Sequence, residues 1–251
     1  MPDYRHRAVC SVLTLMLALT ARAEEKKEVA GPGDNTPPEG FVALFNGKDL
    51  SGWKGLLKPG KSADPAVPGN LDNPYMKAKL TPEQLAAAQG EADENMRKNW
   101  VVQDGVMVFS GKGRSICTAK DYANFEMYVD WKILPNGDSG IYVRETPQIQ
   151  IWDPASKTAN GVGSGGLWNN KNNPSKPSEK ADKPIGEWNR FWIKVVGDKV
   201  TIKLNDVLVV DNVVLENYWD RSKPLLEKGN IQLQNHGNTL WFKNIYVKEL
   251  Q

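Results

Sequence analysis

The feature that most limits the fold is a succession of short alternating segments between residues 100 and 250. In each segment an apolar side chain takes every second position, as it does in a strand with one buried face. Turn signals separate several of them, at Asp104-Gly105, Gly197-Asp198 and Asn205-Asp206. The segments do not alternate with helical patterns, as the strands of a parallel sheet would. We therefore predict an all-β fold, an antiparallel β-sandwich.

One region before these segments has helical signals instead. A proline-rich loop covers residues 56–74, and "TPEQLAAAQGEADENMRKNW" follows it. Thr81 stands at an N-cap, Pro82 at the first helical position, and Gln84 at capping-box spacing from Thr81. We expect a short helical insertion at about residues 75–98, packed on the edge of a single sandwich domain that spans residues 40–251.

The first residues predict export. Basic residues at positions 5 and 7 precede an apolar stretch at 8–20, which is too short to span a bilayer, and Ala21-Arg22-Ala23 fits a cleavage site. We expect a signal peptide over residues 1–23, cleaved near Ala23, and a periplasmic or secreted protein without a membrane span. Residues 24–39, charged and then rich in glycine and proline, are expected to form a flexible leader.

Removal of this peptide changes the charge balance. The chain has 32 Lys and Arg against 30 Asp and Glu; the peptide carries three of the former and one of the latter, which leaves 29 of each. The mature protein is thus formally neutral and has no basic stripe. Nucleic acid and anionic membranes are therefore not expected as partners.

Cysteine and histidine are scarce as well. Loss of Cys10 leaves Cys117 without a partner in the chain, and loss of His6 leaves His236 as the one histidine. An internal disulfide, a multi-histidine zinc site and a cysteine cluster are all excluded. No cofactor is indicated, and a metal would have to be a hard ion with oxygen ligands, such as calcium.

Polar side chains alternate with the buried ones and define a candidate ligand surface. They are Tyr128, Asp130, Tyr142, Arg144, Gln148, Gln150, Gln232, Gln234 and His236. A trough of such donors and acceptors suits a polyol, and the nine tryptophans of the chain suit stacking on sugar rings. We predict a carbohydrate ligand.

The strand around Gln148 and Gln150 argues against an ordinary glycosidase. A retaining enzyme needs two carboxyl groups about 5 Å apart, which on a strand would read acid, any residue, acid. Amides stand at both positions here. A glucanase of the same sandwich class is therefore disfavoured.

Six motifs resemble one known family. They are "LFNGKDLSGW", "YANFEMYVDWKI", "GDSGIYVR", "PQIQIWD", "GEWNRFWIKVVGDKVTIKLND" and "IQLQNHGNTLWFKNIYVKEL". In order and spacing they resemble the 3-keto-disaccharide hydrolase family over roughly residues 41–250. The resemblance implies a concanavalin A-like jelly-roll sandwich with 3-keto-glucoside lyase and 3-keto-2-hydroxyglucal hydratase activity.

That chemistry needs no pair of carboxylates. The ketone acidifies the hydrogen on C2, a base removes it, the C1 substituent leaves, and water adds to the resulting glucal. We expect His236 to be the acid/base and Arg144 to bind the oxyanion, with Asp138 and Asp153 as a second acid/base or as metal ligands. We expect substrate contacts from the residues Gln148, Gln150, Gln234, Tyr142, Glu145 and Trp168.

Each assignment has a structural alternative. His236 can cap a turn, Arg144 can form a surface ion pair, Asp138 and Asp153 can make Asx-turns, and Trp168 can anchor its loop. The chain also has amides at Gln148 and Asn235, where the family pattern commonly has acids. A non-catalytic carbohydrate-binding module is therefore the alternative function.

Overall fold

Strand β6 (Phe125–Ile133) shows why this sequence builds a sandwich. Its alternate residues Phe125, Met127 and Val129 are fully buried, whereas Glu126 and Tyr128 between them are partly exposed. The strand therefore has one apolar face that must pack against a second layer. The structure is a computed structural model, and it describes residues 34–62 and 65–251.

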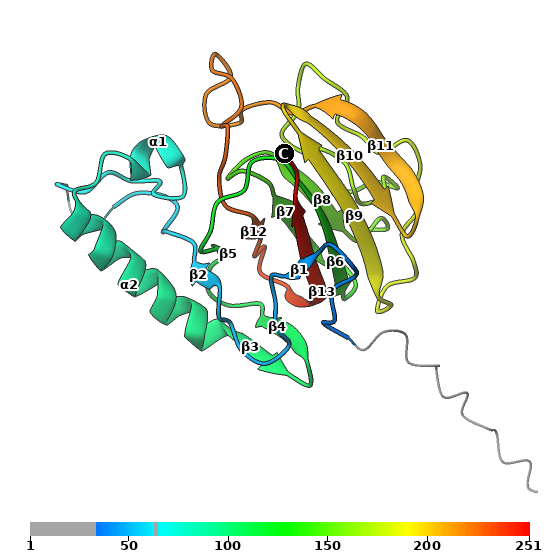
Figure 1. Cartoon of the computed structure of the whole chain (residues 1–251), viewed down its shortest axis with the longest axis horizontal. Coiled ribbons are helices and arrows are strands. Elements are labelled where there is room, and N and C mark those ends of the chain that lie inside the picture. Colours follow the sequence, from blue (N-terminus) through cyan, green and yellow to red (C-terminus); the bar gives the residue numbers. More distant parts are fainter. Residues whose placement is uncertain (1–33, 63–64) are drawn as a thin grey trace, which may run out of the picture. The chain divides into compact units, whose positions relative to one another are not determined.

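Within the described residues, eight strands form the larger sheet (Figure 1). All of its pairings are antiparallel. Their order across the sheet is β11 (Val207–Val214), β10 (Lys199–Leu204), β9 (Asn189–Val196), β6, β13 (Thr239–Glu249), β4 (Val106–Ser110) and β3 (Trp100–Gln103), with β1 (Val42–Ala43) also paired to β13.

Five further strands form the smaller sheet, again antiparallel. Their order is β2 (Trp53–Gly55), β5 (Ile116–Thr118), β12 (Gln232–Leu233), β7 (Asp138–Tyr142) and β8 (Gln148–Trp152). Tyr142 pairs with Gln232 on one side and with Gln148 on the other, so these three residues form a row across the sheet. Side chains at paired positions share a face, and this row faces away from the core.

The two sheets enclose one apolar core. The larger sheet contributes Trp131, Phe191 and Phe242, and the smaller one Ile141 and Ile149, all of them buried. Each such burial stabilises the fold by about 1.5–3 kcal/mol. The expected fold class, a jelly-roll sandwich of the concanavalin A type, is confirmed.

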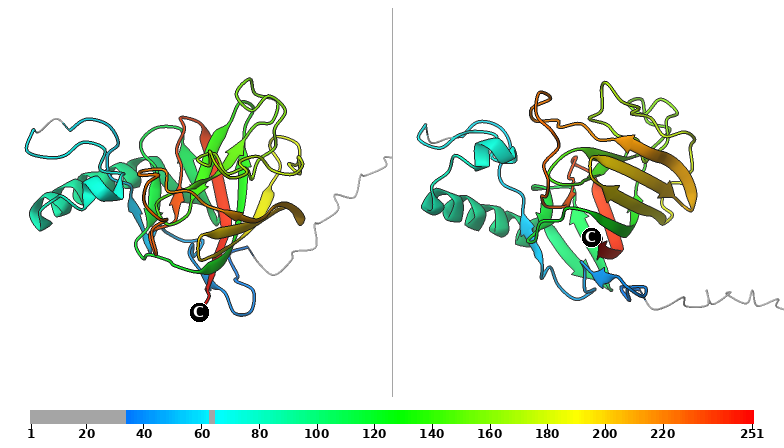
Figure 2. Two further views of the ribbon diagram at one scale, coloured as in Figure 1. Left: turned by 90° about the horizontal axis from the view of Figure 1, so that it is seen from above. Right: turned by 45° about the horizontal axis from the view of Figure 1, so that its top comes forward.

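The helical insertion lies to one side of the sheets (Figure 2). It contains α1 (Pro74–Lys77) and α2 (Pro82–Asn99). Thr81 caps α2 in a full capping box with Gln84, as the sequence predicts. The helix α2 packs on β2, the edge strand of the smaller sheet, where Gly55 donates its N–H to Asp93 at 2.9 Å.

The structure describes only part of the N-terminal region for which the sequence makes predictions. The signal peptide lies outside the described residues. Two described residues of the expected leader are bound rather than free: Asn35 exchanges hydrogen bonds with Asn244 on β13, and Asp34 pairs with Lys243. These two positions are therefore tied to β13, where Oδ1 of Asn35 accepts the backbone N–H of Asn244 at an irregularity of the strand, and the flexible leader stays a prediction.

A second correction concerns Tyr128 and Asp130, which we grouped with the glutamines. Both lie on β6 in the larger sheet, and Asp130 there accepts two hydrogen bonds from Arg190, at 2.6 and 2.8 Å. The alternation of a strand shows which side chains share its faces, but not which sheet the strand joins.

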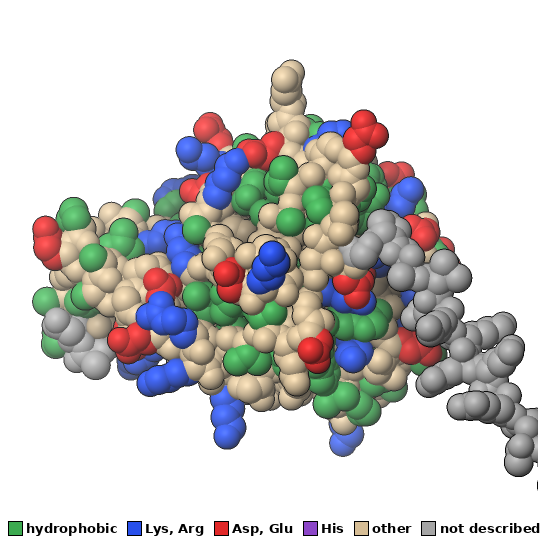
Figure 3. Space-filling view, turned by 60° about the horizontal axis from the view of Figure 1, so that its bottom comes forward, with side chains coloured by type: hydrophobic (Ala, Val, Ile, Leu, Met, Phe, Trp, Pro, Cys, Tyr) green, Lys and Arg blue, Asp and Glu red, His purple; other side chains and the backbone are tan. Residues whose placement is uncertain are grey.

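Acidic and basic side chains intermingle on the face in Figure 3, with apolar side chains between them in small groups. That face presents no field of a single sign. None of the helices in the described ranges is long and apolar enough to cross a membrane.

Candidate active site

A hydrogen-bonded network of amides runs along the outer face of the smaller sheet. Gln148 donates through Nε2 to Gln234 at 2.9 Å and to Gln150 at 3.0 Å, and its Oε1 accepts from the hydroxyl of Tyr142 at 2.8 Å. Gln150 in turn donates to Asp138 at 2.8 Å. The carboxylate and the hydroxyl thus fix the orientation of every amide between them.

These glutamines are less accessible than an open trough requires. The exposed fraction is 3% for Gln148 and 4% for Gln150. The long loop after β8 folds back on that strand, and Gly165 and Gly166 exchange backbone hydrogen bonds with Gln150 at 2.8 Å. Of the network, Tyr142, Gln234 and Asp138 keep partial exposure.

A cavity of about 260 Å³ opens beside Tyr142 and Gln234. Its walls come from five separate parts of the chain. The lining residues are Leu56, Leu57, Pro59, Asp72, Gly113, Arg114, Ser115, Tyr142, Tyr218, Trp219, Gln232, Gln234 and Asn235. The insertion, the sheet and two loops therefore meet at one site that can hold a small polar ligand.

Asp72 brings a carboxyl group to this cavity, and the sequence analysis missed it. Its Oδ1 is shielded from solvent and has no hydrogen-bond partner. Burial raises the pKa of Asp72 above its ordinary value, against the opposing effect of the backbone N–H groups of Asp72 and Asn73. In the sequence "NLDNP" this aspartate is typical of a turn, and nothing there points to the sheet.

Two aromatic residues that line the cavity were also missed. Tyr218 and Trp219 lie edge to face with ring centroids 4.9 Å apart, and both line the cavity. Trp219 is held by a hydrogen bond from Nε1 to the carbonyl of Glu145 at 3.2 Å. Rings placed beside amides and a carboxyl group are typical of sugar sites.

The two glutamines that line the cavity, Gln234 and Gln232, differ in the hydrogen bonds that their side chains make. Gln234 is engaged with Gln148 and, more weakly, donates to the hydroxyl of Tyr142 at 3.4 Å. The side-chain amide of Gln232, by contrast, makes no hydrogen bond with any described residue, although it lines the cavity. Burial also raises the pKa of Tyr142, which keeps its hydroxyl protonated.

The structure places His236 at the other end of β7 from Tyr142. Its Nδ1 is 3.7 Å from Oδ2 of Asp138, and its side chain is 60% exposed. His236 is absent from the lining of the cavity, although its neighbour Asn235 takes part. The histidine therefore contacts the far end of the amide network, through Asp138.

Arg144 does not line the cavity beside Tyr142, although we expected it to bind the oxyanion there. Strand β7 ends at Tyr142, and Arg144 has a φ of 53°, so the alternation that placed its side chain beside Tyr142 no longer applies. Its guanidinium donates to the carbonyl of Ala123 at 2.7 Å and to Asn124 at 3.2 Å, beside a different hollow. Burial lowers its pKa. Arg144 and His236 do not converge.

Asp153 and Glu145 have structural contacts. Asp153 accepts from the backbone N–H groups of Asn136 at 2.8 Å and Ala155 at 2.9 Å, as in the turn that was its alternative reading. Glu145 accepts from Lys77 of α1 at 2.6 Å. Neither residue lines the cavity.

Trp168 belongs to a second hollow on the same sheet, of about 320 Å³, which Gln150 and Trp152 also line. The side chain of Trp168 is 54% exposed and lies edge to face on Trp152, with centroids 5.6 Å apart. It is thus available for stacking at one side of the amide network.

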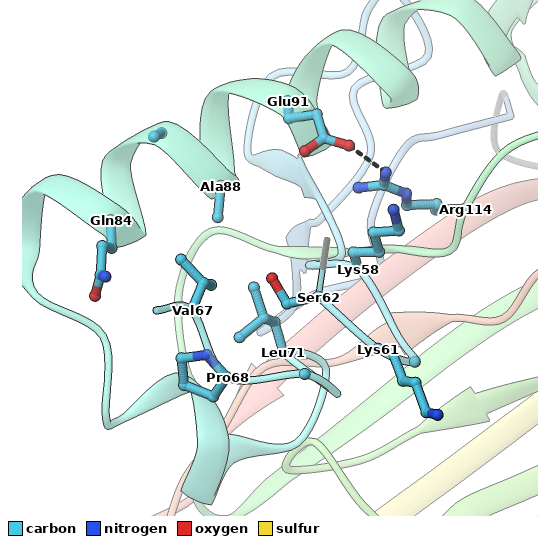
Figure 4. Close-up of a pocket in the computed structure, with 13 residues that line it drawn as sticks. Lys58, Lys61, Ser62, Val67, Pro68, Leu71, Gln84, Ala88, Glu91 and Arg114 are labelled. Carbon is cyan, nitrogen blue, oxygen red and sulfur yellow. Dashed lines mark hydrogen bonds and ion pairs between the residues drawn. The ribbon is translucent and has the colours of Figure 1, made fainter. Parts of the chain in front are cut away.

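A third hollow lies between α2 and the loop at residues 58–71 (Figure 4). Val67, Leu71 and Ala88 line it with apolar groups, and the ion pair of Glu91 with Arg114 closes one side, at 2.5 Å. This hollow belongs to the small core of the insertion and offers little for catalysis.

The described residues contain no group of three His, Cys, Asp or Glu side chains that could hold a metal. The expected calcium ligands, Asp138 and Asp153, are engaged in the contacts described above. Cys117 is free and buried, and burial raises its pKa to about 12, which makes it a poor nucleophile.

Fold and site together define a jelly-roll sandwich with a polar, aromatic-walled cavity on its smaller sheet. The chain belongs to the family of the 3-keto-alpha-glucoside-1,2-lyase-like domain, whose model matches residues 40–248. It is 23% identical to the 3-keto-disaccharide hydrolase of Bacteroides thetaiotaomicron over 84% of this chain and 79% of that protein.

Crystal structures from Parabacteroides distasonis, of proteins provisionally assigned as glycosyl hydrolases, have the same fold. One has a TM-score of 0.59 and 25% identity, and covers 87% of this chain and 100% of its own. A second has a TM-score of 0.58 and 23% identity, with coverage of 95% and 100%.

Proposed function

We propose that this protein hydrolyses 3-keto glycosides, by elimination across C2 and C1 followed by hydration of the glucal, after export from the cytoplasm. Family membership and the name of the Bacteroides relative support the substrate class. The observation that carries the proposal is the cavity beside Tyr142, where amides and aromatic rings surround a single carboxyl group among the described lining residues.

This lining fits elimination better than direct displacement. Displacement of a glycoside requires two carboxyl groups at a set separation, whereas elimination from a 3-keto sugar requires one base and a donor to the enolate oxygen. The free amide of Gln232 is suited to be that donor. Gln234 and the hydroxyl of Tyr142 are suited to bind the remaining sugar oxygens.

The buried part of the network then has a positioning role. Gln148 and Gln150 would hold Tyr142 and Gln234 in place rather than contact the sugar, because their own amides are already bonded. Asp138, facing His236, fixes the orientation of Gln150 from the far end. The role of Arg144 in this proposal is to hold the backbone beside Ala123.

The test is to incubate the purified protein with a 3-keto glucoside and, separately, with the same glucoside carrying an ordinary C3 hydroxyl. We expect aglycone release from the oxidised sugar alone, with a transient enone absorbance from the glucal. Equal release from both sugars would identify an ordinary glycosidase. No release, when the oxidised sugar is shown to bind, would remove the enzymatic proposal.

A carbohydrate-binding module is the second candidate, favoured by the exposed Trp168 on Trp152. A module would bind unoxidised glycans and release nothing. Equilibrium binding of both sugar forms, measured by calorimetry, separates the two functions.

A further inference from the structure

We propose that Asp72, which the helical insertion supplies, is the base that removes the C2 proton of the 3-keto sugar. This inference rests on the function proposed above and names a catalytic residue for it. It replaces His236 in that role, and it means that the smaller sheet binds the substrate while the insertion supplies the reactive group.

The position of Asp72 is the first observation. The residue lies in the loop between β2 and α1, and it lines the same cavity as Tyr142, Gln232 and Gln234. Its Oδ1 is excluded from solvent and accepts no hydrogen bond. An unpaired buried carboxylate oxygen is costly in a folded protein and calls for an explanation, of which a catalytic role is one.

The residues on either side of Asp72 are held by contacts of their own. Leu71 before it is buried with Leu57 in the core of the insertion, and Asn73 after it caps α1 by accepting the N–H of Tyr75 at 2.9 Å. Lys77 then ties α1 to Glu145 at 2.6 Å. The carboxyl group is therefore fixed from both sides relative to the sheet.

The electrostatic surroundings agree with this role. Burial raises the pKa of Asp72, which makes its carboxylate a stronger base. The other titratable groups that line the cavity are Arg114, Tyr142 and Tyr218. The guanidinium of Arg114 is engaged by Glu91 at 2.5 Å, which limits its effect on Asp72.

The reaction balances without an oxidant or reductant. The carboxylate takes the proton from C2, and the electrons of the C2–H bond form the enolate, whose oxygen accepts a hydrogen bond from the amide of Gln232. The enolate collapses to restore the ketone, C1 and C2 become doubly bonded, and the C1–O bond breaks. The leaving oxygen takes the proton from the carboxylic acid. Water then adds its hydroxyl to C1 and a proton to C2.

Asp72→Asn is the test, because the amide keeps the shape and an oxygen for the backbone N–H groups. With a 3-keto glucoside in D₂O, we expect the wild-type protein to exchange the C2 hydrogen and release the aglycone. In the variant, the rates of exchange and of aglycone release should both fall by about 10²–10⁴-fold. Its melting temperature should stay equal or rise, since the variant removes a buried charge that disfavours the fold.

The acid limb of the pH–rate profile adds a second readout. In the wild-type protein the rate should rise with pH through a pKa above the ordinary value of 3.8. Asp182→Asn is the matched control: burial raises its pKa too, but both of its oxygens accept from the N–H of Ser164, and it does not line the cavity. The Asp182→Asn variant should leave the pKa of the acid limb unchanged.

The outcomes separate the two proposals. If the wild-type protein is active and Asp72→Asn stays within tenfold of it, the assignment of Asp72 is overturned and the proposed function stands. If the wild-type protein binds the oxidised sugar but neither exchanges nor releases anything, both fail. If Asp72→Asn unfolds, Asp72→Glu decides: exchange above the background without enzyme supports the base, and background exchange in a folded variant overturns it.

Discussion

Gln148 donates a hydrogen bond to Gln234 at 2.9 Å, although 86 residues separate the two in the chain. One lies on β8 and the other directly after β12, on either side of β7. The bond crosses β7 on the outer face of the sheet, next to the cavity that Tyr142 and Gln234 line. This contact helps to fix the orientation of the amide side chains. Gln148 also orients Tyr142, because it accepts the hydrogen bond of the Tyr142 hydroxyl.

Gln148→Glu should therefore destabilise the protein at neutral pH by about 1–3 kcal/mol, since it replaces a buried donor by an acceptor that faces two amide oxygens. The introduced carboxyl group should have a folded-state pKa above its unfolded value of about 4.3. The loss should then be absent below the unfolded pKa and grow as the pH rises through the folded one. Urea denaturation at several pH values measures this. An equal loss at low pH would show that packing, not charge, is responsible.

Two glycines give a matched pair for the docking of the insertion. A Cβ on Gly55 would lie 2.0 Å from the carbonyl oxygen of Ala92 on α2, whereas a Cβ on Gly90 would meet nothing within 4 Å. Gly55→Ala should separate α2 from β2 and cost about 1–3 kcal/mol or more. Gly90→Ala should stabilise the helix by about 0.5–1 kcal/mol. Hydrogen exchange in α2 reports both; similar exchange in the two variants would contradict the close contact.

The ion pair of Lys77 with Glu145 should couple the insertion to the sheet. Lys77→Met leaves the carboxylate of Glu145 buried without a counter-charge, although Asn230 still donates to it at 3.1 Å, and the change should cost about 2–4 kcal/mol. The double variant with Glu145→Gln should recover part of this loss, because no charge is then buried. A thermodynamic cycle from denaturation gives the coupling. A coupling near zero would mean that α1 is held by other contacts.

Trp168→Ala should weaken sugar binding without harming the fold. The ring is mostly exposed and contacts Trp152 at its edge, so its removal should change stability by less than about 0.5 kcal/mol. Lost stacking on a sugar should raise KM about 5- to 150-fold, corresponding to about 1–3 kcal/mol, with kcat little changed. Steady-state kinetics measures the split. A fall in kcat alone would assign Trp168 to the chemical step instead.

Local patterns predicted what local physics controls. The capping box of Thr81 with Gln84, the hairpin turn at Asp104-Gly105 and the buried alternation of β6 are all present as expected. Each depends on a few neighbouring residues, whose hydrogen bonds and apolar spacing are visible in a single sequence.

The predicted positions of the site residues were also right only where local structure is regular. Strand parity correctly placed Tyr142, Gln148 and Gln150 on one outer face, because all three lie inside regular strands. It failed for Arg144, which follows the end of β7 with a positive φ. Strand parity makes no prediction for Asp72, because this residue lies in a loop.

The sequence by itself determined the family, the sandwich and the polar face, since alternation and turn chemistry act over a few residues. Only the tertiary structure decided which strands share a sheet, how deeply the amides are buried, and that Asp72 lines a cavity together with Gln232 and Gln234. These depend on contacts between segments far apart in the chain, such as Lys77 on Glu145, and their geometry follows from packing that no local pattern encodes.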